Sequence, residues 1–267
     1  MRLLPLADAE QVGHRAARHI ATRIREFAPD EQRPFVLGLP TGSTPLPTYR
    51  ALIRLHRAGA VSFRHVLTFN MDEYVGLPQA HPQSYHAVMQ AQLFRHLDLP
   101  RHRHHLPDGM AGDLHAECRR YEALLAQHGP VQLFLAGVGR NGHLAFNEPG
   151  APLDSRTRVV SLSEATRRAN ARFFHDTPER VPERALTVGL ATLLEAEEIV
   201  LLVTGAHKAR ALQAAVEGPV SPQWPVSALQ RHPNTLIFCD HAATRALAPS
   251  TLHPCRQHQL NPPGCPE

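Results

Sequence analysis

The sequence predicts an α/β protein with a mostly parallel sheet covered by helices on both faces. Short apolar runs of the strand type alternate along the chain with helical patterns of ten or more residues, which is the order of βαβ units. The most continuously apolar run, Ile199 to Thr204, is typical of a central parallel strand. The 267 residues, of which 43% are hydrophobic, are enough to bury a substantial core. We therefore expect a single domain.

The first half of the chain predicts four helices and two strands. A helix over Asp8 to Phe27, with Asp8 as N-cap, follows from apolar residues that recur at three- and four-residue steps. A strand and a tight loop follow, and Pro45 suits the first turn of the next helix. In chain order, the predicted elements are a helix at Asp8–Phe27, a strand at Phe35–Leu39, a helix after Pro45, a strand at His65–Asn70, and helices at about Ser84–His96 and Asp113–His128.

The second half continues the alternation of strands and helices. The predicted strands are Val131–Ala136, Arg158–Ser163, Ala185–Gly189, Ile199–Thr204 and Thr235–Cys239, and the predicted helices are Glu164–Phe174, Ala191–Ala196, Ala209–Glu217 and about His241–Leu247. We assign residues 1–250 to one domain. The Pro- and His-rich residues 251–267 have no period, and we expect a flexible C-terminal tail.

Charge and cysteine content narrow the class of protein. The net charge is +4, from 28 Lys and Arg against 24 Asp and Glu, and the arginines are scattered. A dedicated nucleic-acid-binding protein would show a clustered basic face, so we expect no nucleic-acid partner and favour a small anionic substrate. The four cysteines show no spacing of a zinc site or a disulfide framework, which indicates free thiols in a reducing cytoplasm.

The hydropathy of the chain favours a soluble cytoplasmic protein. The N-terminal stretch MRLLPLADAE has only a short apolar patch, which Pro5 interrupts, and it lacks the apolar core of a signal peptide. No run approaches the roughly 20 apolar residues of a membrane span, so we expect no membrane partner. The sequence leaves a homo-oligomer open.

Two patterns suggest sites that their context does not support. The pentapeptide from Arg101 to His105 is rich in histidine, but it lacks accompanying carboxylates and helical i, i+4 spacing, so we interpret it as a solvated loop and expect no metal. The pattern Gly137-x-Gly139-x-x-Gly142 matches the dinucleotide fingerprint, which needs a helix to begin within the glycines. Here residues 146–150, FNEPG, interrupt any such helix, so we expect no nicotinamide or flavin cofactor.

The loop from Leu39 to Pro45 is the better anion site. Gly42 lets backbone N–H groups converge, Ser43 and Thr44 offer hydroxyls, and the following helix points its positive end at the loop. The ending of a Walker A loop is absent, which favours a single sugar phosphate over a nucleoside triphosphate; an ordinary capped turn remains the alternative. Two further cations, Arg172 and Lys208, are candidates to complete a phosphate site.

The acid–base candidates are Asp72 and His143. An aspartate with an ordinary pKa of about 3.9 is a weak base, so proton abstraction would need partial desolvation, for which Met71 and Tyr74 provide apolar neighbours. Asp72 with Glu73 could also be solvated residues at a strand end. His143 lies in the glycine-rich stretch from Leu135 to Pro149, and Glu148 could orient its imidazole and favour the protonated ring.

Seven strings distributed over most of the chain resemble the glucosamine-6-phosphate deaminase family, in that family's order. They are LGLPTGSTP, TFNMDEYVGL, HPQSYH, GVGRNGHLAFNEPG, SRTR, ALTVG and GAHKARALQAAVEG. The resemblance runs from about Leu37 to Asp240. It implies a modified doubly wound (Rossmann-like) α/β fold and the conversion of glucosamine 6-phosphate and water to fructose 6-phosphate and ammonia, without a metal or organic cofactor.

The resemblance also implies residue roles. Asp72 would move the proton between C2 and C1 through an enolamine, before hydrolysis of the imine. His143 would open the pyranose ring, assisted by Glu148 and by residue 141. The phosphate would be held by the residues Gly42, Ser43, Thr44, Arg172 and Lys208.

Two departures from the family pattern concern tuning and regulation. Many members have aspartate where this chain has Asn141, and an amide orients an imidazole without stabilising its charge by a full unit. Hexameric members activated by N-acetylglucosamine 6-phosphate have serines and a lysine where this chain has Ala151, Pro152 and Val160, and a tyrosine where it has Pro254; Arg158 remains. We therefore expect no activation by the acetylated sugar.

Two alternatives stay open at the level of sequence. A 6-phosphogluconolactonase-like hydrolase would share the phosphate loop but would need no carboxylate to move a carbon-bound proton. A non-catalytic sugar-phosphate sensor, such as the effector domain of a transcription regulator, would need a DNA-binding module, for which the residues before Phe35 offer only a single helix.

Overall fold

Two sheets form the framework of the protein, whose computed structural model describes residues 1–252. The larger sheet is parallel throughout, as predicted. Its seven strands lie in the order β1 (Arg2–Leu6), β10 (Thr235–Asp240), β9 (Ile199–Val203), β6 (Leu133–Gly137), β2 (Phe35–Leu39), β3 (Val66–Asn70) and β5 (His104–His105). The smaller sheet is antiparallel, in the order β4 (Asp72–Tyr74), β8 (Arg184–Thr187) and β7 (Arg158–Ser161).

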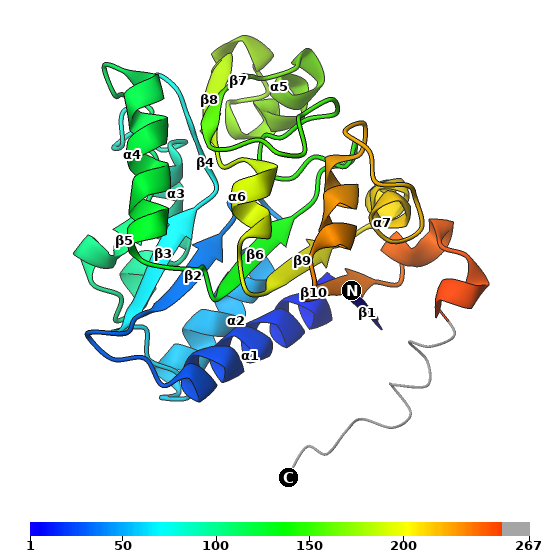
Figure 1. Cartoon of the computed structure of the whole chain (residues 1–267), viewed down its shortest axis with the longest axis horizontal. Coiled ribbons are helices and arrows are strands. Elements are labelled where there is room, and N and C mark those ends of the chain that lie inside the picture. The colour runs from blue at the N-terminus through cyan, green and yellow to red at the C-terminus, as the bar shows by residue number, and fades with distance from the viewer. Residues whose placement is uncertain (253–267) are drawn as a thin grey trace.

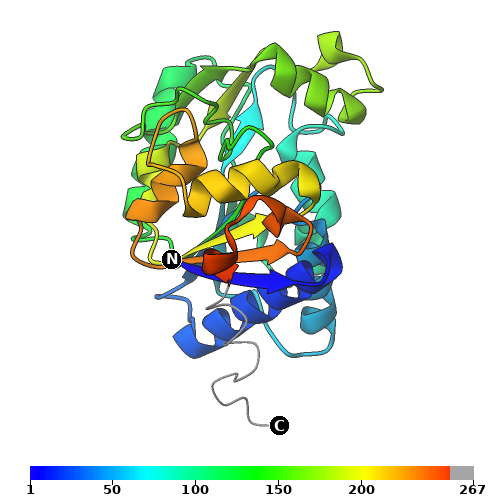
Figure 2. The same ribbon diagram turned by 90° about the vertical axis from the view of Figure 1, so that its right-hand side faces the viewer.

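Helices cover both faces of the larger sheet, as the alternating pattern predicted (Figure 1). One face packs against α1 (Ala9–Phe27), α2 (Leu46–Arg57) and α3 (Tyr85–Gln92), and the other against α4 (Leu114–Gln127), α6 (Leu190–Leu194) and α7 (Ala209–Val216). The helix α5 (Glu164–Asn170) lies instead beside the smaller sheet. Seen from the side, the layer with α1, the sheet and the layer with α7 follow one another (Figure 2).

Side-chain alternation along each strand divides the core into two layers. In β2, Phe35, Leu37 and Leu39 face the layer of α1, whereas Val36 faces the opposite layer. All five residues of β2 and of β9 are buried, which explains why these strands are continuously apolar in the sequence. The predicted central strand at Ile199 is thus confirmed, with β10 and β6 as its neighbours.

Local side-chain caps set several helix starts. Asp8 accepts a hydrogen bond from the backbone N–H of Gln11 at 2.8 Å and begins α1, as predicted. Ser84, Asp113 and Ser163 cap α3, α4 and α5 in the same way. Pro45 is the N-cap residue of α2, not part of its first turn as the sequence suggested; Pro47 occupies that turn instead.

The structure adds to or corrects three points about strands. The N-terminal residues, for which the sequence analysis predicted no element, form the strand β1 beside β10. The predicted loop at Arg101–His105 is a 3-10 turn followed by the edge strand β5, whose His105 packs 5.0 Å from the Phe69 ring. The predicted strands near residues 158–163 and 185–189 exist, but they pair antiparallel in the smaller sheet.

The described part of the chain ends at Leu252. Residues 253–267, most of the predicted flexible tail, lie outside the described residues, whereas Thr251 and Leu252 are helical. Among residues 1–252, no helix has the length and apolar content needed to cross a bilayer.

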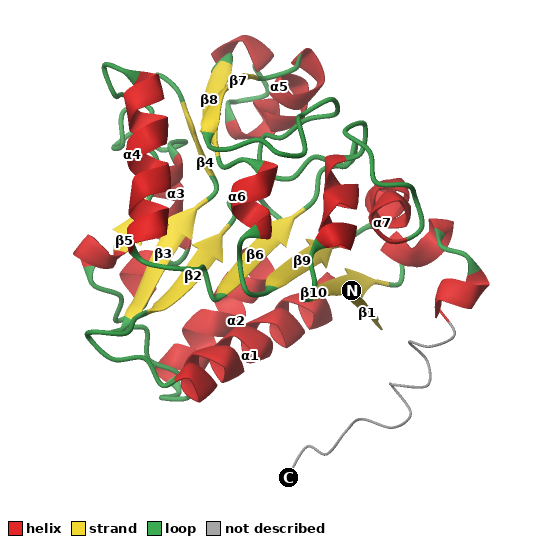
Figure 3. Ribbon diagram, in the orientation of Figure 1, coloured by secondary structure: helices red, strands yellow, loops and turns green. Residues whose placement is uncertain are grey.

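The strand order places a switch point between β2 and β6. From β2 the chain proceeds outward through β3 to β5, and from β6 it proceeds the other way through β9 and β10. In open α/β sheets, ligands bind beyond the carboxyl ends of the strands at such a point. The arrowheads of β2, β3, β6 and β9 point toward the smaller sheet and α5, which lie beyond these ends (Figure 3).

Candidate active site

A cavity of about 890 Å³ lies at the predicted switch point. The loops after four parallel strands line it: residues 40–44 after β2, Met71 and Asp72 after β3, residues 137–143 after β6, and residues 204–208 after β9. Side chains of α3 and of the α5 segment complete the wall. Of the nine sequence-predicted site residues, eight line this cavity: Gly42, Ser43, Thr44, Asp72, Asn141, His143, Arg172 and Lys208. Glu148 stands apart from the lining.

The residues of the predicted phosphate site come together on the loop after β2. Gly42 has φ of 95°, a conformation that favours glycine and lets the loop turn sharply. The side chain of Lys208 donates a hydrogen bond to Thr44 Oγ1 at 2.7 Å, and that of Arg172 approaches Ser43 Oγ at 3.4 Å. Segments 129 and 164 residues apart in the chain thus meet at one hydroxyl-rich loop.

Lys208 is held in an environment that favours anion binding. Its side chain is almost fully buried, and burial together with the charge of Arg172 lowers its pKa to about 8, while Asp240 partly offsets this. A buried ammonium without a carboxylate in direct contact is costly, and a bound phosphate would supply the missing charge. Asp240 is engaged elsewhere, since it accepts the Gly205 backbone N–H at 2.8 Å.

Asp72 lines the same cavity and has the desolvation that the sequence analysis required. It is 6% exposed, and Met71 and Tyr74 beside it are buried and also line the cavity. Burial, followed by the charge of Glu73, raises the pKa of Asp72 to about 8, against a smaller lowering by the Thr41 hydroxyl. A pKa near the working pH is what a general base needs.

Glu73 faces a different environment from Asp72. Its carboxylate accepts three backbone N–H groups, from Tyr74 at 2.7 Å, Tyr85 at 3.0 Å and His86 at 3.1 Å. Two of these donors belong to the first turn of α3, whose positive end favours a carboxylate. Burial raises the pKa of Glu73 to about 7, and the three N–H donors counteract this rise. The adjacent carboxylates are therefore buried groups, not solvated residues at a strand end.

His143 is half-buried in the loop after β6. Its imidazole packs so closely on Gly139 that a Cβ at that position would lie 2.2 Å from the ring. Burial lowers the pKa of His143, while Glu148 raises it and Lys208 lowers it further. The ring atom Nδ1 is buried and makes no hydrogen bond within residues 1–252. Burial thus favours the neutral imidazole, whereas the charge of Glu148 favours the protonated ring, as the sequence analysis expected.

Asn141 and Glu148 do not contact the imidazole in this structure. Asn141 Oδ1 accepts the backbone N–H of His143 at 3.4 Å, and Glu148 Oε1 accepts the backbone N–H of Ser163 at 3.2 Å. Ser163 is the N-cap residue of α5, so Glu148 is tied to the helix that leads to Arg172. Glu148 influences His143 only through its charge, and the predicted oriented pair stays a prediction.

Two residues of the site were not singled out from the sequence. Thr41, between the strand end and Gly42, places its hydroxyl 3.5 Å from Asp72 and so connects the phosphate loop to the carboxylate. Tyr85 of α3 also lines the cavity. Burial raises the pKa of its phenol most, and the charge of the nearby Asp72 carboxylate raises it further. For both residues, the only indication in the sequence was that each lies in a string shared with the family. A single hydroxyl-bearing residue forms no sequence pattern that would mark it as part of a site.

The glycine-rich stretch after β6 does not lead into a helix. After Gly142 the chain forms a tight turn closed by the Leu144–Asn147 bridge, and no helix begins in the glycines. Within residues 1–252, no three His, Cys, Asp or Glu side chains are grouped to hold a metal ion.

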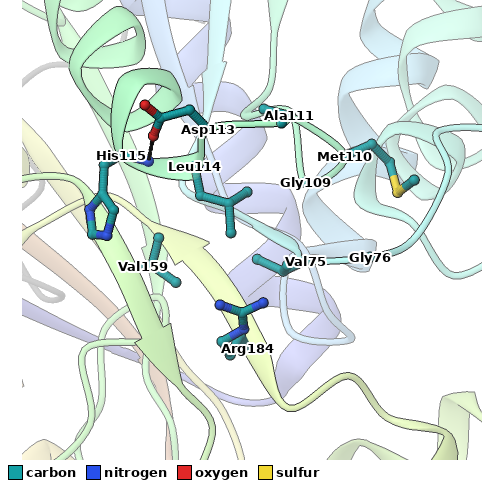
Figure 4. A pocket seen from close by; sticks show the side chains of 11 residues that line it. Val75, Gly76, Gly109, Met110, Ala111, Asp113, Leu114, His115, Val159 and Arg184 are labelled. Carbon is teal, nitrogen blue, oxygen red and sulfur yellow. Dashed lines mark hydrogen bonds between the residues drawn. The ribbon is translucent and has the colours of Figure 1, made fainter.

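A second cavity, of about 540 Å³, lies between the first turn of α4 and the smaller sheet (Figure 4). Val75, Leu114, Val159 and Arg184 are among its lining residues, and Asp113 beside them caps α4. None of the predicted site residues lines it, so the first cavity is the candidate site.

Comparison with known proteins points to one family. A family model described as glucosamine-6-phosphate isomerases/6-phosphogluconolactonase matches residues 7–238. A solved structure of a monomeric glucosamine-6-phosphate deaminase is 44% identical, covers 92% of this chain and 100% of its own, and superposes with a TM-score of 0.88. The 6-phosphogluconolactonase of Trypanosoma brucei is 22% identical over 92% of this chain and 98% of its own (TM-score 0.71), and that of Thermotoga maritima is 20% identical over 90% and 98% (TM-score 0.68).

Proposed function

The chain belongs to the family of glucosamine-6-phosphate isomerases and 6-phosphogluconolactonases, and we infer that it is a glucosamine-6-phosphate deaminase. It converts glucosamine 6-phosphate and water to fructose 6-phosphate and ammonia. The observation that carries this function is the buried carboxylate of Asp72 in the same cavity as a cationic hydroxyl-rich loop. A reaction that moves a carbon-bound proton needs such a base, whereas lactone hydrolysis does not.

The phosphate end positions the sugar. Ser43, Thr44, Lys208 and Arg172 present donors to one point, and the backbone at Gly42 lies at the positive end of α2. Binding the phosphate there directs the rest of the substrate toward Asp72 and His143. Holding the reacting carbon atoms against these groups is itself a large part of the rate enhancement.

His143 is proposed to open the pyranose ring. It removes the proton of the C1 hydroxyl and returns a proton to the ring oxygen as the C1–O5 bond breaks, which leaves an open-chain aldehyde. The neutral imidazole favoured by burial is the form that accepts a proton. The charge of Glu148 stabilises the imidazolium that results, even without direct contact.

Asp72 is proposed to take the proton from C2 of the open-chain sugar and deliver it to C1. The C2–H electron pair forms the C1–C2 double bond while the C1=O π pair moves to O1, which takes up a proton released by the substrate ammonium, and the product is an enolamine. Protonation at C1 by the Asp72 carboxyl then gives the C2 iminium. Water adds to this iminium and ammonia leaves, which yields the ketose. The pKa of about 8 in the free protein suits a base, and a protonated substrate amine beside Asp72 would lower it, which increases the ionised fraction.

This chemistry calls on side chains alone, and we propose that neither a metal nor an organic cofactor takes part. A cytoplasmic location and the oligomeric state of the protein remain predictions as well. The similar enzyme of solved structure is described as monomeric.

The test is a comparison of two substrates with the purified protein. With glucosamine 6-phosphate we expect equal amounts of ammonia and fructose 6-phosphate. With 6-phosphoglucono-lactone we expect hydrolysis no faster than without protein. The opposite pattern would establish the lactonase, and binding of glucosamine 6-phosphate without turnover would establish a sensor.

A further inference from the structure

A row of three residues crosses the smaller sheet beside the candidate site. Thr187 in β8 is the backbone partner of Asp72 in β4 on one side and of Arg158 in β7 on the other. Residues directly opposite each other in an antiparallel sheet have side chains on the same face. Asp72, Thr187 and Arg158 therefore share one face, and Asp72 is the only one of them that lines the main cavity.

The other two residues of the row hold the loop that carries His143. Thr187 Oγ1 accepts the backbone N–H of Phe146 at 3.1 Å, and Arg158 Nη1 donates to Asn147 Oδ1 at 2.8 Å. Thr187 is fully buried. Without its hydroxyl, the backbone N–H of Phe146 would lose its hydrogen-bond acceptor.

Asn147 connects this row to the turn itself. It is fully buried, and its side-chain amide donates to the backbone oxygens of Leu144 at 2.9 Å and Val188 at 2.8 Å. The guanidinium of Arg158 fixes which end of that amide accepts and which end donates. The turn includes Ala145 at φ of 51°, a left-handed conformation that is unfavourable outside glycine, so these bonds hold a turn that would otherwise relax.

We propose that Thr187 and Arg158 are positioning residues that fasten the His143 loop to the strand of Asp72 and so set the two halves of the active site at a fixed separation. The inference rests on the proposed function, because it assigns the two halves to ring opening and proton transfer. Both residues act through Phe146 and Asn147, and neither lines the cavity. The phosphate loop meets the row at Asp72 alone, through the hydroxyl of Thr41, and its other side-chain contacts come from Lys208 and Arg172.

The test compares Thr187→Val, which keeps the shape but removes the acceptor, with Thr187→Ser, which keeps the hydroxyl. Thr187→Val and Arg158→Met are expected to lower kcat for ammonia release by about tenfold to a hundredfold, the scale of small misplacements of catalytic groups, with KM within about twofold of wild type. Thr187→Ser is expected to keep wild-type kcat. Val159→Ala serves as the matched control, because Val159 follows Arg158 in β7 and lies on the opposite face of that strand. This variant should leave kcat and KM unchanged.

Amide hydrogen exchange resolved at Phe146 gives a readout that does not depend on turnover. In Thr187→Val this amide should exchange at least about tenfold faster than in wild type and in Thr187→Ser. If Thr187→Val does not fold, Arg158→Met tests the proposal instead, through its kcat and through the rate of amide hydrogen exchange at Asn147. Variants that lose thermal stability but keep wild-type kcat and exchange would overturn the proposal. A wild-type protein that releases no ammonia would refute the proposed function. The exchange data would still show whether Thr187 and Arg158 hold the His143 loop in place.

Discussion

At the scale of single residues, the adjacent carboxylates Asp72 and Glu73 have different tasks because their surroundings differ. Glu73 receives three backbone N–H groups and is fully paired, whereas Asp72 receives only the distant hydroxyl of Thr41. Hydrogen bonds from N–H groups favour the ionised form of a carboxylate, so they counteract the effect of burial on Glu73, whereas Asp72 has no such donors. The pKa of Asp72, about 8, thus lies above that of Glu73, about 7, and the charge of Glu73 is one of the causes that raise it.

Replacing Glu73 with Gln should therefore lower the pKa of Asp72. Burial, the larger cause of the rise, persists, but the neighbouring charge is lost, so we expect the acidic limb of the pH profile of kcat/KM to move down by about one pH unit. Asp72 is active when ionised, which means that the variant should be relatively more active below pH 7. An acidic limb that moves up or stays in place would contradict this assignment.

Asn141→Asp tests the opposite half of the site. A carboxylate next to the His143 backbone would favour the protonated imidazole, whose pKa burial now keeps low. We expect the limb of the profile that reports His143 to move to higher pH, with the limb of Asp72 little changed. Asn141→Ala serves as the control for loss of the amide. A profile identical to that of wild type would contradict a role for residue 141.

The site was foreseeable where residue type and strand end coincide, and not where it depends on three-dimensional contacts. Asp72, His143 and the loop at Gly42 follow strand ends, so the sequence brought them to one rim. That Glu148 contacts Ser163 instead of the imidazole depends on how α5 packs, which no local pattern encodes. The contact between the Thr41 hydroxyl and Asp72 likewise depends on tertiary packing.

At the scale of elements, the strands and helices with the strongest periodicity were predicted and the short polar ones were not. The helix α1 and the strand β2 were predicted to within a residue, because burial on one or both faces leaves a clear apolar period. The strands β4 and β5 have three and two residues, too few for a period, and the apolar run of β1 is interrupted by Pro5. Whether β7 and β8 join the main sheet is decided by tertiary pairing, so their antiparallel sheet was missed.

A buried ion pair that joins α1 to the sheet offers a test at this scale. The carboxylate of Glu198, just before β9, is 3% exposed and lies 2.8 Å from both His19 Nε2 and Arg23 Nε of α1. Burial alone would raise the pKa of Glu198, but the contacts with His19 and Arg23 outweigh it and lower the pKa. A lowered pKa means that the contribution to stability is present above the ordinary value of about 4.3 and is lost as pH falls below it.

We expect Glu198→Gln to lower the free energy of unfolding at pH 7 by about 1–3 kcal/mol, since bonds to a charged group are lost while the partners are partly solvated. The difference from wild type should shrink below about pH 4. Urea unfolding at both pH values measures it, with Glu197→Gln on the adjacent residue as control. Equal stability of the Glu198 variant and wild type at pH 7 would contradict this account.

At the scale of the whole molecule, the contacts of Arg158 bear on whether this fold can bind a regulatory sugar phosphate. Arg158, the one residue retained from the effector pattern of hexameric relatives, is engaged with Asn147 and with the Arg156 backbone oxygen inside this fold. Ala151 is buried and has no polar side chain, and Pro254 lies outside the described residues. A guanidinium already paired in this way is a poor receptor for a second phosphate.

We therefore expect hyperbolic kinetics that N-acetylglucosamine 6-phosphate does not activate. Initial rates over a range of glucosamine 6-phosphate concentrations, with and without the acetylated sugar, measure this. A sigmoidal curve that becomes hyperbolic on its addition would show that an effector site exists after all.

The central claim is that one cavity combines a phosphate cradle, a ring-opening histidine and a carbon-proton base, and Asp72→Asn tests it most directly. Ammonia release from glucosamine 6-phosphate should fall by about 10²- to 10⁴-fold, the usual contribution of a general base. The variant should remain folded, because a neutral amide is easier to bury than a carboxylate. Ammonia release by a folded Asp72→Asn variant at the wild-type rate would contradict the mechanism.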